Sequence, residues 1–387
     1  MKRKLYICIM SLLLICCTFL TTACNNQEQA GPRDTKLLSG SFLQSWICRD
    51  WTAARWDQEF AAMKELGMDY LVLQSVYDAS FRQGKGEEQN WESYVLRGYL
   101  GMYPSEIDEL DVAVLSTQNK GDALELALKA AKNNGMQIFI GLVSDERWWD
   151  FGWGVPKLPD GKKNTATESY FATWCEYNGK LNAQMIDEIW NRYGEEYGEQ
   201  IAGWYYYNEI WNFDAACWGL DGNAYATCIG NNINHFLNAI NETCPEKPLM
   251  LSPFFNDTIS TAIQYKQFWI NIFEVANFRE GDIFAPQDCV GGKHITIDEL
   301  DSWIGNLKKA ADTEKGLRFW VNNECFTSDF KPADVKQFTQ QIEATEKYGE
   351  THLTFSWNHY YNPLNDSAAE SYNNALKEYL KQRGELE

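Results

Sequence analysis

Short apolar or aromatic runs alternate with longer amphipathic segments from Gly40 to the end of the chain. A short apolar run suits a buried strand, whereas apolar positions recurring every three or four residues suit a helix that covers a sheet. This order of strand and then helix repeats eight times along the sequence. The predicted strands are Ser41–Trp46, Tyr70–Val76, Gln137–Val143, Gly203–Asn208, Leu249–Ser252, Ile283–Gln287, Arg318–Asn323 and His352–Trp357.

The predicted helices lie between these strands and after the last one. Gly67, Gly135 and Gly316 each stand shortly before a strand, where glycine can adopt the left-handed conformation that ends a helix. Strict alternation predicts an α/β fold of the (β/α)8 TIM-barrel type. An open nucleotide-binding sheet is not favoured, because no Gly-x-Gly-x-x-Gly motif follows a strand. The predicted helices are Ala53–Leu66, Ala123–Asn133, Glu168–Tyr193, Ala224–Thr243, Thr258–Val275, Ile297–Ala311, Pro332–Tyr348 and Ser367–Gln382.

Two of the predicted strands run directly into a glutamate. Glu209 follows the fourth strand and Glu324 follows the seventh, and active sites of such barrels lie at the carboxyl ends of the strands. Cleaving a glycosidic bond with retention requires one carboxylic acid to protonate the leaving oxygen and one carboxylate to attack the anomeric carbon. A glutamate at a strand end can equally form a rim salt bridge or a cap. The strand numbers of the two residues favour the catalytic interpretation.

The chain resembles the large clan of retaining TIM-barrel glycosidases in Asn208-Glu209, Glu324 and Trp357. The resemblance implies that Glu209 is the acid/base, with a pKa raised by the second carboxylate, and that Glu324 is the nucleophile. It also implies carboxyl groups about 5–5.5 Å apart and an Asn208 amide that binds a sugar hydroxyl. The chain departs from the clan at Gln74, which stands near the end of strand two where the clan usually has arginine.

The chain is also similar to a family of bacterial secreted and lipoprotein barrels known as domains of unknown function with a suggested glycosidase activity. The likeness rests on the phrases at 284–288 (Phe-Ala-Pro-Gln-Asp) and 355–361 (Phe-Ser-Trp-Asn-His-Tyr-Tyr). It extends from about Ser39 to the C-terminus. Both resemblances therefore imply a single catalytic-type domain over residues 38–387.

Tryptophans close to strand ends are candidates for sugar contact, because aromatic faces suit the C–H faces of sugar rings. Trp46, Trp211 and Trp357 are the strongest of these, although loop tryptophans also pack as core. Polar residues after the strands are predicted to bind substrate hydroxyls or to support a catalytic glutamate, with a structural role at the rim as the alternative. They are Gln74, Gln287, Asp288 and His359, together with the pair Asp145 and Glu146.

The N-terminus has the pattern of a secretory signal over residues 1–23. Three basic residues precede an apolar run from Leu5 to Leu20, and Ala23-Cys24 resembles a lipoprotein cleavage site. Cys24 is therefore the predicted lipidation site, and residues 24–37 are a predicted flexible tether. These features predict a lipid-anchored protein of the bacterial cell envelope, on an outer or cell-surface membrane, with plain secretion as the alternative. A Cys24→Ser variant is then expected to leave the membrane fraction.

Charge and cysteine content restrict the partners. The net charge of −20 becomes −23 once residues 1–23, which hold three basic and no acidic residues, are removed. Nucleic acid is thus an unfavourable partner, since phosphate contacts need clustered lysine and arginine. Four histidines without ligand spacing predict neither a metal nor another cofactor. Seven cysteines after Cys24, an odd number without Cys-x-x-Cys spacing, are predicted to be buried thiols. We expect a monomer.

The leading hypothesis is a retaining glycoside hydrolase that acts on an extracellular carbohydrate. A glycan-binding surface lipoprotein without turnover, built on the same TIM-barrel scaffold, is the alternative from another class. The two differ in whether the paired glutamates cleave a glycan. A metal-dependent amidohydrolase is a third hypothesis, and the scarcity of histidine disfavours it.

Overall fold

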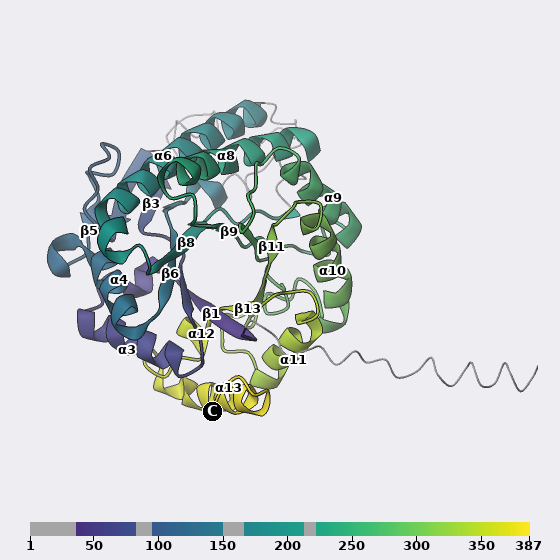
Figure 1. The fold of residues 1–387 in the computed structure, drawn as a ribbon. Helices are drawn as coiled ribbons and strands as arrows, with labels where there is room; N and C mark the ends of the chain where they lie inside the picture. Colours follow the sequence, from purple (N-terminus) through teal and green to yellow (C-terminus); the bar gives the residue numbers. More distant parts are fainter. Residues whose placement is uncertain (1–35, 83–94, 150–165, 213–221) are drawn as a thin grey trace, which may run out of the picture. The chain divides into compact units, whose positions relative to one another are not determined.

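A ring of parallel strands surrounded by helices forms the body of the protein in a computed structural model (Figure 1). The structure describes residues 36–82, 95–149, 166–212 and 222–387. Lys36–Glu387 form one compact unit. Within the described ranges, no helix is both long enough and apolar enough to cross a membrane. The predicted signal and Cys24 lie outside the described residues.

The ring contains eight strand positions in chain order, which confirms the predicted barrel. The hydrogen-bonded order is β11-β10-β9-β8-β6-β2-β1-β13-β12. The seventh position is one strand interrupted at Trp320, whose N–H still donates to the Phe284 carbonyl at 3.0 Å. Its first part pairs with β10 and its second with β13, so the ring closes. The strands are β1 (Leu38–Leu43), β2 (Tyr70–Leu73), β6 (Gln137–Gly141), β8 (Ile201–Tyr206), β9 (Leu249–Leu251), β10 (Ile283–Phe284), β11 (Arg318–Phe319), β12 (Val321–Glu324) and β13 (His352–Phe355).

Large side chains fill the interior of the barrel. Because successive strand residues point to opposite faces, each strand places alternate residues inside and the others against the helices. Burying each large apolar side chain contributes roughly 1.5–3 kcal/mol to folding, so the filled ring is a rigid platform for the residues above it. The interior cluster consists of Phe42, Val72, Phe139, Tyr205, Met250, Ile283, Ala285, Trp320 and Leu353.

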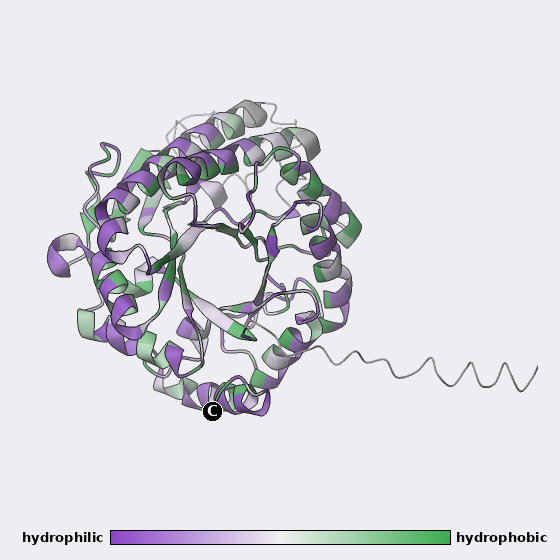
Figure 2. Cartoon of the chain, viewed as in Figure 1, coloured by the Kyte–Doolittle hydropathy of each residue, from purple (hydrophilic) through white to green (hydrophobic). Residues whose placement is uncertain are grey.

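The covering helices alternate between hydrophilic and hydrophobic positions, as expected for helices with one face on the sheet (Figure 2). Gly67, Gly135 and Gly316 have φ values of 74°, 61° and 82°, which confirms the predicted left-handed helix ends. The helices are α3 (Ala53–Lys64), α4 (Ala123–Asn134), α6 (Ala166–Tyr197), α8 (Gly222–Thr243), α9 (Ala262–Phe273), α10 (Leu300–Ala311), α11 (Val335–Thr345) and α13 (Glu370–Gln382), with short turns η2 (Asn119–Gly121), η3 (Ile297–Glu299) and η4 (Ser367–Ala369).

A second, small sheet follows the second and third barrel strands, and the sequence did not predict it. Its strands are β3 (Tyr77–Arg82), β4 (Val95–Gly101), β5 (Val114–Leu115) and β7 (Val143–Asp145), in the order β5-β4-β3-β7. Asp145 is buried there and pairs with Arg147 at 2.6 Å. Glu146 accepts the Phe81 N–H at 2.8 Å. Asp145 therefore has the structural role that was the alternative to substrate binding, whereas Glu146 is exposed and its predicted substrate contact stays a prediction.

The observed strand ends differ from the predicted ones by one to three residues, and two of these differences move a candidate tryptophan. The first strand ends at Leu43, so Trp46 lies in the short helix α2 (Ser45–Cys48). The last strand ends at Phe355, and Trp357 begins the short helix α12 (Trp357–Tyr360), capped by the Ser356 side chain. Apolar content alone does not distinguish a strand from one turn of helix, which explains both errors.

Candidate active site

Glu324 is the last residue of β12, and strand alternation points it into the barrel on the same face as Trp320. Its side chain is buried, and Oε2 accepts the Gly292 N–H at 2.8 Å. The loop reaches this position because Gly291 has no side chain. A Cβ there would lie 2.8 Å from the Glu324 Cβ and 2.4 Å from the Phe326 carbonyl oxygen. Glu324 is thus held by the strand below and by the backbone of the 291–292 loop beside it.

Asp288 lies directly behind Glu324 and is completely buried. Oδ2 accepts the side-chain N–H groups of Gln341 at 2.6 Å and Asn323 at 2.8 Å. Oδ1 accepts the backbone N–H groups of Val290 at 3.2 Å and Glu324 at 3.3 Å. The predicted sugar contact by Asp288 is therefore wrong, since none of its surface is exposed. Its other predicted use, support of a catalytic glutamate, fits these contacts.

The amides that bind Asp288 tie this cluster to neighbouring elements. Gln341, on α11, also donates to the Glu324 carbonyl at 2.9 Å. The Asn323 Oδ1 lies 2.7 Å from Nδ1 of His352, which starts β13. Burial and the adjacent Asp288 carboxylate raise the pKa of Glu324. Four hydrogen bonds favour the ionised form of Asp288. Of the two carboxyl groups, Glu324 is therefore the one that is less readily ionised.

Glu209 lies three residues beyond β8, on the same alternation as the inward-facing Tyr205. The residue keeps some exposed surface, and its Oε1 accepts the Gln287 side-chain N–H at 3.2 Å. Burial of the carboxyl raises the pKa of Glu209 to about 7, and the Gln287 bond opposes this. The pKa of Glu209 is raised, as predicted, but the cause is desolvation and not the second carboxylate. In the other direction, the charge of Glu209 contributes to the raised pKa of Glu324.

The amides near Glu209 are mostly committed to the protein. Gln287 also donates to the Ser252 carbonyl at 3.1 Å, so its amide supports Glu209 from the β9 side. The Asn208 Nδ2 donates to Asn178 at 3.2 Å, whereas its buried Oδ1 has no hydrogen-bond partner. This oxygen is itself buried, so the predicted contact of Asn208 with a sugar hydroxyl stays a prediction. Gln74 is buried beside β2, and its Oε1 likewise has no partner.

The three candidate tryptophans have different surroundings. Trp46 is 69% exposed, and its indole N–H donates to the Gln44 side chain at 3.0 Å. Trp211 is largely buried and stacks on Phe254 with ring centroids 4.8 Å apart. Trp357 is fully buried, and its N–H donates to Asn373, next to the outer face of the barrel, at 3.0 Å. Trp357 therefore has no face available to a sugar, which contradicts the prediction for this residue.

Phe355 occupies the strand-end position that the sequence analysis gave to Trp357. It is partly exposed and packs against the interior residue Phe42 with centroids 6.0 Å apart. His359, on α12, lies beside it at 5.5 Å. The alternation of Leu353 and Phe355 on the inner face was the signal that could have identified Phe355.

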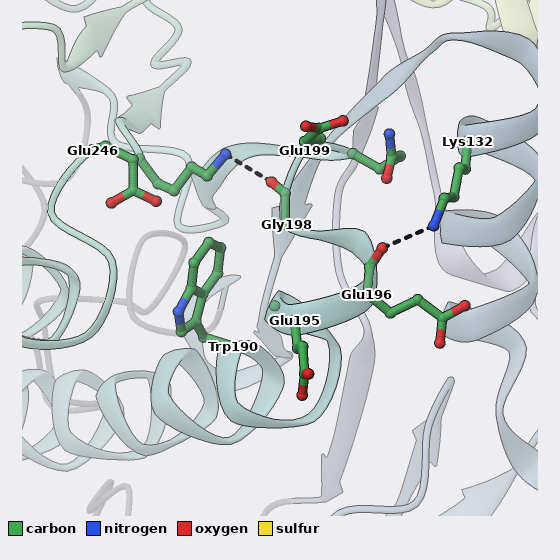
Figure 3. A pocket seen from close by; sticks show the side chains of 10 residues that line it. Lys132, Trp190, Glu195, Glu196, Gly198, Glu199 and Glu246 are labelled. Carbon is green, nitrogen blue, oxygen red and sulfur yellow. Dashed lines mark hydrogen bonds between the residues drawn. The ribbon is translucent and has the colours of Figure 1, made fainter.

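The opposite end of the barrel carries a pocket of different chemistry (Figure 3). It lies near the end of α6 and the start of β8, and four glutamates line it: Glu195, Glu196, Glu199 and Glu246. Lys132 and Lys247 also line it, and their ammonium groups donate to the carbonyls of Glu196 at 3.1 Å and Gly198 at 2.7 Å. The pocket lies among the amino ends of the strands, where such barrels do not place catalysis.

Within the described ranges, no group of three or more His, Cys, Asp or Glu residues could hold a metal ion. Five cysteines are buried, as predicted: Cys48, Cys175, Cys244, Cys289 and Cys325. Cys228 is only half-buried, which corrects the prediction for this residue, and Cys217 lies outside the described residues. Burial raises the pKa of the Cys289 thiol well above its usual range, so this thiol next to Asp288 stays protonated.

The family comparison matches most of the barrel. A family model described as "Domain of unknown function (DUF4434)" matches residues 38–367. The match includes both phrases on which the resemblance to such a family rested. No curated protein matches the sequence.

Solved structures with a similar fold include several glycosidases. A "putative alpha-L-fucosidase" from Bacteroides thetaiotaomicron VPI-5482 has a TM-score of 0.61 and 23% identity, covering 93% of this chain and 98% of that one. Endo-glycoceramidase II from Rhodococcus sp. has a TM-score of 0.48 and 11% identity, covering 84% and 73%. A family 1 β-glucosidase from Thermotoga maritima has a TM-score of 0.46 and 10% identity, covering 83% and 88%. The first of these likenesses shows a shared fold over nearly the whole of both chains.

Proposed function

The chain belongs to the DUF4434 family of unknown function, and we propose that it is a retaining glycoside hydrolase with Glu209 as acid/base and Glu324 as nucleophile. One observation carries the proposal. Two glutamates project from the carboxyl ends of strands four and seven, and the charge of one raises the pKa of the other. Two interacting carboxyl groups at this face are what hydrolysis through a glycosyl-enzyme requires.

Glu209 is assigned the role of the acid by its place after strand four, and burial lets it, like Glu324, hold a proton at neutral pH. Burial raises its pKa to about 7, close to the pH at which a general acid is most effective. In the first step, Glu209 transfers its proton to the glycosidic oxygen while the bond from that oxygen to the anomeric carbon breaks. In the second step, the resulting carboxylate takes a proton from water, and the water oxygen attacks the anomeric carbon.

Glu324 fits the nucleophile because its position is fixed. The Gly292 N–H occupies Oε2, so Oε1 is the atom that would attack the anomeric carbon and form the ester. The second step breaks this ester and returns Glu324 as a carboxylate. The same N–H stabilises the ionised form, which opposes the effects of burial and of Asp288. Asn208, the residue before Glu209, is the proposed contact for a sugar hydroxyl.

The test is hydrolysis of a panel of aryl glycosides, followed by proton NMR of the first sugar released. We expect at least one glycoside to be cleaved, and the new anomer to have the configuration of the substrate. Release of the inverted anomer would rule out the covalent mechanism. Binding of glycans without cleavage of any aryl glycoside or polysaccharide would favour the glycan-binding alternative instead.

A further inference from the structure

A continuous row of rings begins next to Glu324 and runs across the carboxyl ends of the seventh, eighth and first strands. We call it the aromatic row. Its centroids are separated by 6.1 Å from Trp46 to His359, by 5.9 Å from His359 to Tyr360, by 5.6 Å from Tyr360 to Phe326 and by 6.0 Å from Phe326 to Phe330. Phe355 lies beneath the centre, 5.5 Å from His359 and 5.9 Å from Phe326.

Both ends of the aromatic row are open to solvent. Trp46 is 69% exposed and Phe330 is 74% exposed. In the described ranges these two are the only exposed aromatic side chains. Between them, His359 and Tyr360 are half-buried and Phe326 is buried, so the row is a partly exposed apolar strip, and exposed apolar surface of this kind commonly marks a binding site. The two exposed rings at opposite ends of the aromatic row therefore indicate one shared binding surface.

Phe330 is also held in a conformation that its residue type disfavours. Its φ is 56°, in the left-handed region, which is unfavourable for a residue with a side chain. The turn that imposes this φ is well bonded: the Phe330 N–H donates to the Thr327 carbonyl at 2.7 Å, and Phe326 pairs with Pro332. Phe330 gains little burial in return. Strain of this kind is typical of positions selected for function.

The aromatic row is connected to the catalytic pair through the chain and through space. Phe326 lies two residues beyond Glu324, and the intervening Cys325 N–H donates to the Phe355 carbonyl at 2.9 Å. In space, Glu324 on β12 pairs with Phe355 on β13, the residue that lies beneath the row. A ligand that packs on the row would therefore extend to the reacting bond.

The aromatic row presents no net charge. Burial lowers the pKa of His359 to about 4, so its ring is neutral at physiological pH. The charged side chains on the turn, Asp329 and Lys331, pair with each other at 2.6 Å. Rings without a neighbouring excess of positive charge suit the apolar C–H faces of uncharged sugars, whereas uronic acids or sulfated sugars would need a cation.

We propose that the aromatic row is a subsite that packs against successive rings of a neutral oligosaccharide or polysaccharide. This inference rests on the proposed hydrolase and specifies its substrate class. A sugar ring is about as large as a phenyl ring, so a row of this length covers several sugar units. The substrate is then a glycan chain, and a single aryl glycoside occupies only the part of the site next to Glu324.

Affinity electrophoresis through gels that contain a neutral polysaccharide tests the subsite without requiring turnover. The probes are galactomannan, xyloglucan, mixed-linkage glucan and dextran. We expect at least one to retard the wild-type protein. The Phe330→Ala and Trp46→Ala variants should lose about fivefold or more in affinity for that glycan, since each removes a stacking face. Phe330→Tyr, which keeps the ring, should bind as wild type.

Two controls separate loss of the subsite from loss of the fold. Phe330→Gly removes the ring but accepts the positive φ without strain, so it should be at least as stable as wild type and still fail to bind. Ile263→Ala removes an exposed apolar residue on α9, 66% exposed, and should bind normally. Unchanged glycan affinity in both ring deletions, or retardation by no neutral glycan, would overturn the proposal. So would Phe330-dependent binding to phosphatidylcholine vesicles without glycan binding, which would identify a membrane contact.

The outcome for the subsite is distinguishable from that for the hydrolase. Cleavage of aryl glycosides with glycan affinity unaffected by the ring deletions would support the hydrolase and overturn the subsite. Ring-dependent glycan binding without cleavage would support the subsite and overturn the hydrolase.

Discussion

The strand-seven and strand-four sides of the site hold their glutamates in different ways. Glu324 is buried, receives the Gly292 N–H and lies in front of Asp288, which itself accepts four hydrogen bonds. Glu209 is partly exposed and has one hydrogen bond to a side chain, from Gln287. A nucleophile must be fixed in position, whereas an acid/base must release and regain a proton in each cycle. The two sides are therefore organised for two different tasks.

Removing each carboxyl group in turn should show the difference between the two glutamates most strongly. We expect Glu324→Ala to lose on the order of 10⁴-fold in kcat on every substrate, because no glycosyl-enzyme can form, with partial recovery by azide. Glu209→Ala should lose about 10²- to 10⁴-fold on substrates with poor leaving groups but still form the intermediate from an activated aryl glycoside. Steady-state kinetics on both substrate types measure the difference. Equal and small losses for both variants would mean that neither glutamate is catalytic.

Deleting the Asp288 side chain tests the strand-seven side of the site for stability and function together. Asp288→Ala leaves the amides of Asn323 and Gln341 without their hydrogen-bond acceptor. This change should lower the free energy of unfolding by about 2–4 kcal/mol. Asp282 is a matched control at the amino end of β10, equally buried and paired with Arg279 at 2.7 Å. Asp282→Ala should cost about 3–5 kcal/mol in urea unfolding yet keep kcat where it remains folded. If both folded variants have the same kcat, Asp288 is only structural.

The ionisation of Glu324 can be changed without deleting a side chain. Asp288→Asn removes the neighbouring negative charge, which lowers the pKa of Glu324. Since Glu324 must be ionised to attack, the acidic limb of kcat/KM should move to lower pH by roughly one unit. An acidic limb that stays in place would show that Asp288 does not govern the nucleophile.

On the strand-four side, a substitution should move the pH profile of kcat/KM in the opposite direction and by less. Gln287→Ala removes the N–H that favours ionised Glu209, so the pKa of Glu209 should rise from about 7. Glu209 then stays protonated to higher pH, and the alkaline limb of kcat/KM should move upward by less than about one unit. We expect a change of only a few-fold in kcat at the optimum. Movement of the acidic limb instead would assign the bond to the other glutamate.

Periodicity was sufficient to predict the barrel, because eight apolar runs in alternation with amphipathic helices have few other solutions. It also put Glu209 and Glu324 at the ends of the fourth and seventh strands, and there the structure agrees. It failed at Trp46 and Trp357, where one turn of helix replaces the end of a strand. The burial of Asp288 could not be predicted, because it depends on Gln341 from a distant helix. The aromatic row was missed for a related reason, since its rings come from three separate segments.

We propose that Glu324 forms a covalent bond with the sugar and that Glu209 does not. Incubation with the 2-deoxy-2-fluoro analogue of an aryl glycoside that the protein cleaves, followed by digestion and mass spectrometry, locates this bond. The fluorine slows both steps, and the activated leaving group lets the ester accumulate. We expect one added glycosyl group per chain, on Glu324. A label on Glu209 or Asp288, or continued turnover with no label, would rule out Glu324 as the nucleophile.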